Sequence, residues 1–310
     1  MEVESLTLWI LSEAERLGFD ACGVSPAEAL DRESARMEAW LEADREGEMH
    51  YLNRNKEKRY DPRLLVEGTR SIVTVLYNYY PGTLLSETDN YKLAKYAYGE
   101  DYHEVVKQKL MTLLSVIESR TGRLEGVRAF TDSAPILDRA WAVRCGLGFI
   151  GKNTALIHPR KGSFLFIGHL FLPIELQATG KPMTNHCGRC TRCLDACPTG
   201  ALEAPFHIDA RKCLSYLTIE YKGDLEGQDP SCFHDWIYGC DICQDVCPYN
   251  KKFSIANKEP LFQPSEALTQ LRKKDWEALD RDTFERLFKR SAVRRAGFEG
   301  LRRNINFLRG

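Results

Sequence analysis

The sequence contains no apolar run of the ~18–20 residues that a membrane-spanning helix requires. It also lacks an excess of either charge, with 43 Lys and Arg against 44 Asp and Glu in 310 residues. Glu2 and Glu4 stand where a secretory signal would need basic residues. We therefore expect a cytoplasmic protein with no membrane contact, whose 11 cysteines are thiols or metal ligands rather than disulfides.

The even charge balance conceals a basic C-terminus. Residues 251–310 contain 15 Lys and Arg against 8 Asp and Glu, whereas the first 250 residues contain 28 against 36. A basic tail on an acidic body is a weak indication of a nucleic-acid partner. By itself, such a distribution is more typical of a solvated helical surface.

Hydrophobic periodicity predicts alternating helices and strands in the first half of the chain. Helices are predicted over residues 6–17, 101–120 and 133–145, the last opening at Ser133-Ala-Pro135. Buried strands are predicted over residues 71–77, 129–131 and 163–172. The polar segment 177–185 indicates a boundary, after which the chain is cysteine-dense to about residue 250 and then helical and basic.

Eight cysteines fall into two related motifs. Cys187 to Pro198 reads C-x2-C-x2-C-x3-C-P, and Cys240 to Pro248 reads C-x2-C-x3-C-P, with Cys213 as the missing member. In two-cluster ferredoxins the cysteine before the proline binds the other cluster. The spacing therefore predicts two crossed ligand sets for 4Fe–4S clusters: Cys187, Cys190, Cys193 and Cys247 in cluster 1, and Cys197, Cys213, Cys240 and Cys243 in cluster 2.

Two four-cysteine zinc sites are the alternative, because zinc also binds C-x2-C pairs. Zinc has no need of a C-x3-C-P element twice, so the clusters are favoured. The other three cysteines are not assigned to metal. Cys22 and Cys145 lie in apolar segments and are expected in the core, while Cys232 has no evident role.

Two further features are candidates for a second cofactor or a catalytic group. Gly146-Leu-Gly-Phe-Ile-Gly151 matches G-x-G-x-x-G, but a helix is predicted before it and an extended segment after it, the reverse of a dinucleotide site. Asp132 lies at a predicted strand-to-helix junction. Spacing alone favours a helix cap, and a proton donor beside a redox centre is the functional alternative. The seven histidines show no metal-ligand spacing.

Taken together, the motifs resemble epoxyqueuosine reductases from about residue 10 to the end of the chain. The resemblance is carried by the two cysteine motifs and by the following segments: Glu57-Lys-Arg59-Tyr-Asp-Pro62, Tyr98-Gly-Glu-Asp-Tyr-His103, Asp132-Ser-Ala-Pro135, Asp138-Arg139-Ala140, Gly146 to Asn153, and Arg294 to Asn304. The chain ends soon after Asn304, without the helical-repeat extension of some members.

The resemblance implies an α+β fold in three parts. Residues 1–176 would form a nitroreductase-like cobalamin-binding catalytic domain. Residues 177–260 would form a bacterial dicluster ferredoxin-like domain, and 261–310 a basic helical segment packed on the core. The implied reaction reduces the epoxide of epoxyqueuosine to queuosine in the wobble position of tRNA, the last step of queuosine biosynthesis.

The resemblance also reverses the interpretation of Asp132, which becomes the general acid. It implies these cobalamin contacts: Arg59, Asp132, Leu137, Asp138, Arg139, Leu156 and Ile167, with Ser215, Thr218 and Glu220 as weaker candidates. No histidine is expected as a lower cobalt ligand. The implied partners are the anticodon stem-loops of the Asp, Asn, His and Tyr tRNAs and an external electron donor of flavodoxin or ferredoxin type, and the protein is expected to be a monomer.

Seven basic residues of the tail become candidates for contacts with tRNA phosphates: Arg286, Lys289, Arg290, Arg294, Arg295, Arg302 and Arg303. Two other functions stay open from sequence. One is a cobalamin-dependent reductase of a small molecule, such as a reductive dehalogenase. The other is a simple electron-transfer protein, which the large N-terminal half disfavours.

Overall fold

A four-stranded antiparallel sheet, in the order β1-β2-β7-β4, organises the N-terminal half of the computed structural model, which describes residues 3–310. Its strands are β1 (Ala21–Pro26), β2 (Ser71–Asn78), β7 (Leu165–Leu172) and β4 (Arg128–Phe130). The α+β class and the three predicted strands are confirmed. β7 begins two residues later than predicted because the Ser163 amide donates to the Asn250 side chain instead of joining the ladder.

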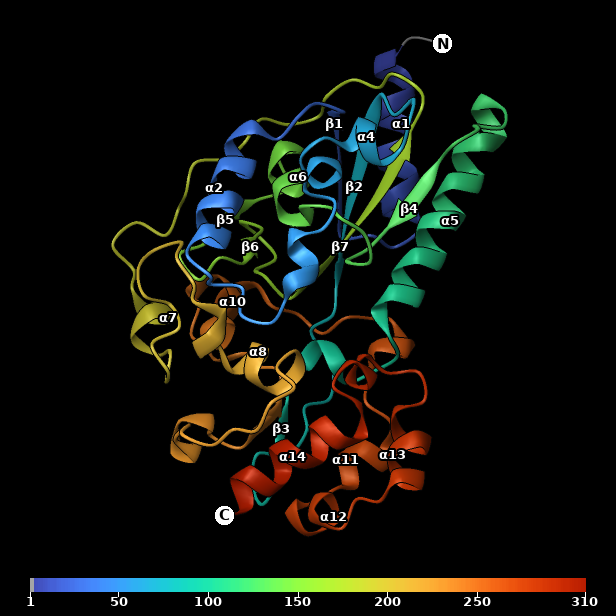
Figure 1. Ribbon diagram of the computed structural model, residues 1–310. Coiled ribbons are helices and arrows are strands. Elements are labelled where there is room, and N and C mark those ends of the chain that lie inside the picture. Colours follow the sequence, from blue (N-terminus) through green and yellow to red (C-terminus); the bar gives the residue numbers. More distant parts are fainter. Residues whose placement is uncertain (1–2) are drawn as a thin grey trace.

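Helices cover both faces of this sheet (Figure 1). On one face, alternate residues of β2 such as Val73 and Val75 pack with α1 (Val3–Arg16) and α5 (Tyr102–Thr121). On the other face, Leu76 and its neighbours pack with α6 (Asp138–Arg144). Burial on both faces explains why β2 and β7 are continuous apolar runs rather than alternating ones.

The segment between β1 and β2 contributes α2 (Asp31–Glu42), η1 (His50–Asn53), α3 (Lys56–Tyr60) and α4 (Pro62–Leu65). Leu30 and Val66, at either end of this segment, share a buried cluster with Trp141 of α6. The segment therefore lies on the α6 side of the sheet, the same side on which Asp138 begins its helix.

The close approach of α5 to the sheet depends on Gly168 in β7. A Cβ atom at this position would lie 2.9 Å from Leu110 Cδ1 and 3.0 Å from Val106 Cγ1. A side chain here would push α5 outward. Gly168 thus fixes the distance between the sheet and the helix whose first residues are Tyr102 and His103.

The predicted helix from Ser133 is wrong, since α6 begins only at Asp138. Asp132 has a φ of 50°, in the left-handed region that few residues other than glycine adopt, so the chain turns sharply as it leaves β4. The following residues form a loop, and Ile136 packs beside Trp141. A loop rather than a helix terminus therefore carries Asp132.

The glycine run lies between α6 and a short hairpin, β5 (Phe149–Ile150) and β6 (Leu156–Ile157). The predicted order of helix first and extended chain afterwards is confirmed, and this order does not suit a dinucleotide site.

The cysteine-rich region consists of short helices and turns (Figure 1). They are α7 (Arg192–Asp195), η3 (Ala210–Lys212), α8 (Leu214–Ile219), η4 (Pro230–Phe233), α9 (Ile242–Asp245) and α10 (Pro248–Phe253). A parallel pair of strands, β3 (Lys92–Leu93) and β8 (Trp236–Tyr238), joins this region to the N-terminal half, next to η2 (Lys95–Ala97).

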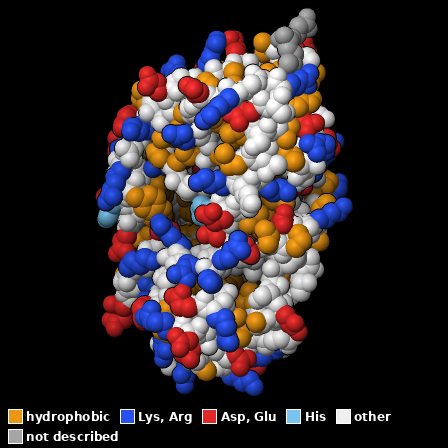
Figure 2. All heavy atoms as spheres, turned by 90° about the vertical axis from the view of Figure 1, so that its right-hand side faces the viewer, with side chains coloured by type: hydrophobic (Ala, Val, Ile, Leu, Met, Phe, Trp, Pro, Cys, Tyr) orange, Lys and Arg blue, Asp and Glu red, His pale blue; other side chains and the backbone are white. Residues whose placement is uncertain are grey.

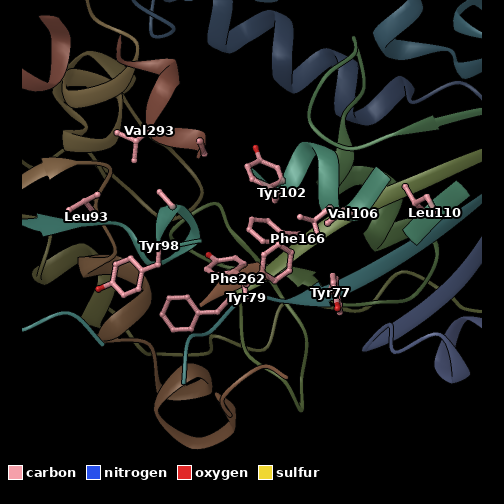
Figure 3. Packing of buried hydrophobic residues seen from close by; sticks show 14 of the residues in the cluster. Tyr77, Tyr79, Leu93, Tyr98, Tyr102, Val106, Leu110, Phe166, Phe262 and Val293 are labelled. Atoms are coloured by element: carbon pink, nitrogen blue, oxygen red, sulfur yellow. The ribbon is translucent and has the colours of Figure 1, made fainter. Parts of the chain in front are cut away.

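The predicted helical C-terminus is confirmed. It comprises η5 (Pro260–Phe262), α11 (Glu266–Gln270), α12 (Lys273–Glu277), α13 (Arg281–Phe288), η6 (Ala292–Arg295) and α14 (Gly297–Arg309). Figure 3 shows Phe262 of this tail beside Phe166 of β7, and Val293 of the tail near Leu93 of β3. One hydrophobic core therefore unites the tail with the N-terminal sheet.

Candidate active site

Asp132 stands at the end of β4 and is held by its neighbours on both sides. The preceding Thr131 hydroxyl donates to the Ile167 carbonyl at 2.8 Å, which anchors the loop to β7. The Tyr102 hydroxyl donates to an Asp132 carboxylate oxygen at 2.5 Å, and His103 Nε2 lies 3.9 Å from the same oxygen. Asp132 caps no helix, because the residue before α6 is Leu137. The helix-cap interpretation is therefore wrong.

Tyr102 and His103 are presented by the first turn of α5. Asp101 caps this helix by accepting from the His103 amide at 3.0 Å, and it also contacts His103 Nδ1 at 2.7 Å. The Tyr102 ring stacks on Phe166 of β7 at a centroid distance of 4.3 Å and on His103 at 4.1 Å. The hydroxyl that faces Asp132 is thus fixed by packing as well as by its hydrogen bond.

The site around Asp132 and Arg139 is open to solvent yet surrounded by protein groups, and it is here called the recess. Solvent reaches both residues, and the Asp132 side chain is 66% exposed. Even so, desolvation is the largest influence on each: together with the Asp138 carboxylate it raises the pKa of Asp132, and it lowers the pKa of Arg139.

The charges around Asp132 act in opposite directions. Its hydrogen bond from Tyr102 and the charges of His103 and Arg139 lower its pKa, but burial and Asp138 outweigh them and raise the pKa. Burial and the nearby Asp132 carboxylate raise the pKa of Tyr102 far above its usual range, so this hydroxyl stays protonated. Desolvation lowers the pKa of His103, but the Asp101 and Asp132 carboxylates outweigh it, and the pKa is raised.

Asp138 connects the recess with the interior of the sheet. One of its oxygens lies 3.5 Å from the Asp132 amide and 3.2 Å from Nε2 of His169, a fully buried residue of β7. His169 Nδ1 in turn contacts the Thr74 hydroxyl at 3.0 Å, and Cys145 Sγ lies 3.3 Å from that hydroxyl. Cys145 is buried, as the sequence predicted.

Arg59 brings an unsatisfied donor to this region. It is buried, and its Nε atom has no hydrogen-bond partner among the described residues. Desolvation lowers its pKa, against the opposing influence of Tyr60, Asp138 and Tyr51. A buried guanidinium with a free donor is costly unless a ligand accepts from it.

Glu220 directly follows α8 and, like Asp132, influences Tyr51. It receives two hydrogen bonds from Arg295, at 2.9 and 2.8 Å, and the Arg295 guanidinium lies over the Tyr51 ring. Burial raises the pKa of Tyr51, with further contributions from the charges of Glu220 and Asp132. Residues from η1, α8 and η6 therefore meet near the loop that carries Asp132.

The remaining predicted contacts differ in their access to the recess. Leu137 and Ile167 are half-buried apolar residues. Leu137 is near Asp132 in the sequence, and the Ile167 carbonyl accepts from Thr131, the residue before Asp132. Leu156 packs beside Ile167 and is almost fully buried. Ser215 is half-buried in α8. Thr218 is fully buried, donates to the Leu214 carbonyl and accepts from the Gly239 amide, so it does not line the recess.

Thiols of the two cysteine motifs lie close enough to influence one another. Burial raises the pKa of Cys247, and the nearby thiols of Cys187 and Cys190 raise it further, although these residues are far apart in sequence. Cys193 is influenced by the same two thiols. No three His, Cys, Asp or Glu side chains within residues 3–310 converge on a single-ion site.

Similar influences act on the cysteines of the later motif, where Cys193 of the earlier motif also affects Cys243. The thiol pKa of Cys240 is raised by burial and by the nearby Cys213 and Cys197, and that of Cys243 by burial, Cys240 and Cys213. Cys197 therefore lies with residues of the later motif, as Cys247 lies with residues of the earlier one.

The glycine run holds both cysteine motifs against the N-terminal half. Lys152 Nζ donates to the carbonyls of Gly188 and Cys190 at 2.8 and 2.9 Å. Asn153 Nδ2 donates to the Cys243 carbonyl at 3.3 Å. The segment that resembles a nucleotide loop is thus a structural bridge.

The basic residues of the tail divide into two groups. Arg303 donates to the carbonyls of Leu217, Tyr221 and Gly223, so it is a structural residue, and its candidacy for phosphate contacts is not supported. Lys289, Arg290 and Arg294 line a pocket of about 180 Å³ against the start of α5. Figure 2, which faces the α5 side, shows hollows near the middle of this face with blue basic side chains around them.

Sequence patterns do not predict that Tyr102, His103 and Tyr51 gather near Asp132. Tyr102 and His103 stand in a motif of the family resemblance, which is the one available signal. The other contacts join residues that are far apart in the chain, and no local pattern reports them.

Two family models and several curated proteins match the sequence of this chain. Residues 59–133 match the family model described as "Epoxyqueuosine reductase QueG, DUF1730", and residues 186–250 match "4Fe-4S double cluster binding domain". The epoxyqueuosine reductase of Cellulophaga algicola is 48% identical over 300 residues, covering 97% of both chains. That of Pseudomonas aeruginosa is 38% identical over 93% of this chain and 81% of its own.

Solved structures agree. The epoxyqueuosine reductase of Streptococcus thermophilus has a TM-score of 0.86 at 31% identity, covering 97% of this chain and 80% of that one. An epoxyqueuosine reductase solved with an epoxyqueuosine-modified tRNA-Tyr stem loop has a TM-score of 0.84 at 29% identity, covering 99% and 81%. None of the helices between residues 3 and 310 is long and apolar enough to span a membrane. The chain belongs to the epoxyqueuosine reductase family.

Proposed function

We propose that this enzyme reduces epoxyqueuosine to queuosine in the wobble position of tRNA. The reaction removes the epoxide oxygen as water and leaves a carbon–carbon double bond, which requires two electrons and two protons. The observation that carries the proposal is the Asp132 carboxyl, held by Tyr102 at the wall of a recess and raised in pKa by burial and by Asp138. A carboxyl group in this setting suits a general acid.

The residues of the recess fit a cobalamin cofactor. Arg59 Nε is a buried donor without a protein partner, and Asp138 and Arg139 add charged groups at the same wall. Leu137, Leu156 and Ile167 supply apolar surface. We propose that these residues hold the cofactor, with Ser215 and Glu220 approaching from the cysteine-rich region. Bound cobalamin would supply a strongly reducing cobalt centre to the epoxide.

Asp132 is proposed to deliver a proton to the departing oxygen. Its raised pKa keeps a larger fraction of the carboxyl protonated near neutral pH than an ordinary aspartate would have. After transfer, the Tyr102 hydroxyl and His103 stabilise the resulting carboxylate. The left-handed backbone of Asp132 turns the chain after β4, and the Thr131 anchor keeps the loop in that position.

The electrons are proposed to arrive through two 4Fe–4S clusters with crossed ligation. Cluster 1 takes Cys187, Cys190, Cys193 and Cys247, and cluster 2 takes Cys197, Cys213, Cys240 and Cys243. The proximity of Cys247 to Cys187, and of Cys197 to Cys240, supports this division. Iron and sulfide analysis tests it, and stoichiometric zinc or iron for one cluster would contradict it.

The substrates are proposed to be the tRNAs for Asp, Asn, His and Tyr, read in their anticodon stem-loops by a monomeric enzyme in the cytoplasm. Lys289 stands beside the start of α5 and is the proposed phosphate contact, whereas its neighbours Arg290 and Arg294 are paired with Glu100 and Glu285. Single-stranded loops are the part of RNA whose bases can be turned outward into a pocket.

The deciding experiment compares substrates on the cobalamin-loaded, iron-loaded enzyme. With a chemical reductant, epoxyqueuosine-containing tRNA should be converted to queuosine-containing tRNA, detected by nucleoside analysis. A halogenated phenol, the substrate of the alternative dehalogenase activity, should not be turned over. Release of halide without conversion of the tRNA would reverse the assignment.

A further inference from the structure

The surface above the first cysteine set carries a cluster of free positive charges. We propose that this surface is the docking site for an acidic one-electron carrier protein, which delivers electrons to the first cluster. The inference deepens the proposed function and rests on its two-cluster assignment. The surface is defined by four cations, here called the basic rim: Arg189, Arg192, Lys251 and Lys252.

Two distant segments are joined to make the basic rim. Cys247 shares a hydrophobic cluster with Cys187 and Tyr249, so α10, which begins at Pro248, is close to the 187–190 loop. The Tyr249 hydroxyl donates to the His186 carbonyl at 3.4 Å. Phe149 packs against both rings, with centroid distances of 5.3 Å to His186 and 5.5 Å to Tyr249.

All four rim residues are exposed, and few acidic residues lie near them in the sequence. No Asp or Glu occurs between residues 176 and 194 or between 246 and 258. Asp195 accepts from Thr191, and Asp245 is paired with Lys95. Within the described part of the chain, none of the four cations has an ion-pair partner. The first 250 residues carry a net negative charge, so the excess of positive charge at the basic rim differs from the rest of that region.

The loop between Cys187 and Cys190 is presented to the outside. A side chain built at Gly188 would meet no atom within 4 Å. From the inner side, Lys152 holds the carbonyls of Gly188 and Cys190, which fixes the loop on the protein. A partner seated on the basic rim would therefore stand directly over the first cysteine set.

The second cysteine set is connected to the recess through α8. Cys213 caps α8, and the chain after α8 reaches Glu220, which is bonded to Arg295 near Tyr51. Each encounter would oxidise the carrier by one electron and reduce the first cluster by one electron. Two encounters supply the two electrons of the epoxide reduction, whose protons come from Asp132 and solvent.

A tRNA is the other macromolecule that a basic surface could bind. The arrangement favours the protein partner. α7 carries Arg192, whereas the first turn of α5 contacts Asp132. These two helices lie on opposite sides of the molecule (Figure 1). The cations of the tail stand beside α5 instead.

The test uses a reduced acidic flavodoxin as probe. Stopped-flow absorbance gives the second-order rate constant for cluster reduction, and a titration gives the affinity of oxidised flavodoxin, both over a range of salt. The charge reversals Arg189→Glu with Arg192→Glu, and separately Lys251→Glu with Lys252→Glu, should lower the low-salt rate constant by about tenfold or more and flatten its salt dependence. Reduction by photoreduced deazaflavin, a small uncharged donor, should not change.

The matched control reverses two exposed cations of α5 and the loop after it, Lys107→Glu with Arg123→Glu, and should leave both readouts unchanged. Glutamine variants of the rim replace any reversal that loses iron. An unchanged rate constant in the rim variants, an equal loss in the control, or weakened binding of a tRNA stem-loop with unchanged flavodoxin binding would each overturn the proposal. Because neither readout uses epoxyqueuosine, a failed turnover assay is distinguishable from a failed docking test.

Discussion

The Tyr102 hydroxyl lies 2.5 Å from a carboxylate oxygen of Asp132, although one residue opens α5 and the other follows β4. α5 packs on one face of the sheet, and Gly168 lets it come close enough for Tyr102 to stack on Phe166. Asp132 reaches the same point because its left-handed backbone turns the chain at the end of its strand. The proposed acid is therefore positioned by the packing of the whole N-terminal half.

Replacement of the acid itself is the first prediction. Asp132→Asn should keep cobalamin and iron and lose turnover by a factor of about 10²–10⁴, the range for a general acid. Cofactor content by absorbance and single-turnover conversion of epoxyqueuosine-containing tRNA are the measurements. Turnover near that of the unmodified enzyme would show that Asp132 has another role.

The pH dependence follows from the Tyr102 contact. The hydrogen bond from Tyr102 stabilises the Asp132 carboxylate and so lowers its pKa. Tyr102→Phe should raise that pKa, and the loss of activity with rising pH should occur at higher pH. The single-turnover rate as a function of pH measures this shift.

A matched control for this substitution is Tyr91→Phe, which removes another tyrosine-to-carboxylate contact, with Glu277 at 3.3 Å, far from the recess. Its pH profile should coincide with that of the unmodified enzyme. A shift toward lower pH in Tyr102→Phe would contradict the proposed role of the hydroxyl.

Crossed ligation can be tested with two double variants. Cys187→Ala with Cys247→Ala affects one predicted set and should leave about half of the iron. Cys187→Ala with Cys197→Ala affects both sets and should remove most of it. Ligation by neighbours in sequence predicts the opposite order. Cys232→Ala, outside both sets, should retain full iron.

Gly168 offers a test of the packing that positions α5. Gly168→Ala should lower the free energy of unfolding by about 1–3 kcal/mol, as overpacking does, because its Cβ would meet Leu110 and Val106. Gly300→Ala in α14 has only Ala296 nearby, at 3.5 Å, and should be neutral or stabilising. Urea unfolding measures both, and an equal effect of the two substitutions would refute this role for Gly168.

The basic residues of the tail are predicted to have two different roles, contact with tRNA phosphates and stabilisation of the fold. Lys289→Gln should weaken binding of the tRNA stem-loop and reduce the slope of log affinity against log salt by about 1. Arg303→Gln should instead lower the urea midpoint, because it leaves the carbonyls of Leu217, Tyr221 and Gly223 without their donor. Affinity measured at several salt concentrations distinguishes the two, and an unchanged slope for Lys289→Gln would exclude that contact.

The sequence by itself determined those features that depend on local spacing. Cysteines separated by two residues can reach one cluster, and the cysteine before the proline binds the other, so this spacing together with Cys213 predicts the two sets. Continuous apolar runs predict β2 and β7, and the Asp101 cap predicts the start of α5, because strand burial and helix capping are properties of neighbouring residues.

Tertiary structure decided the hydrogen bonds and charge interactions between distant residues that no sequence motif predicts. Ser133-Ala-Pro135 matches a helix start, yet contacts with Tyr102 and the Ile167 carbonyl hold the segment at Asp132 open as a loop. Arg303 has the sequence character of a surface cation, but its carbonyl partners lie about 80 residues away. The recess, the free Nε of Arg59 and the basic rim arise only when the sheet, the cysteine motifs and the tail pack together, because hydrogen bonds and charges act through space rather than along the chain.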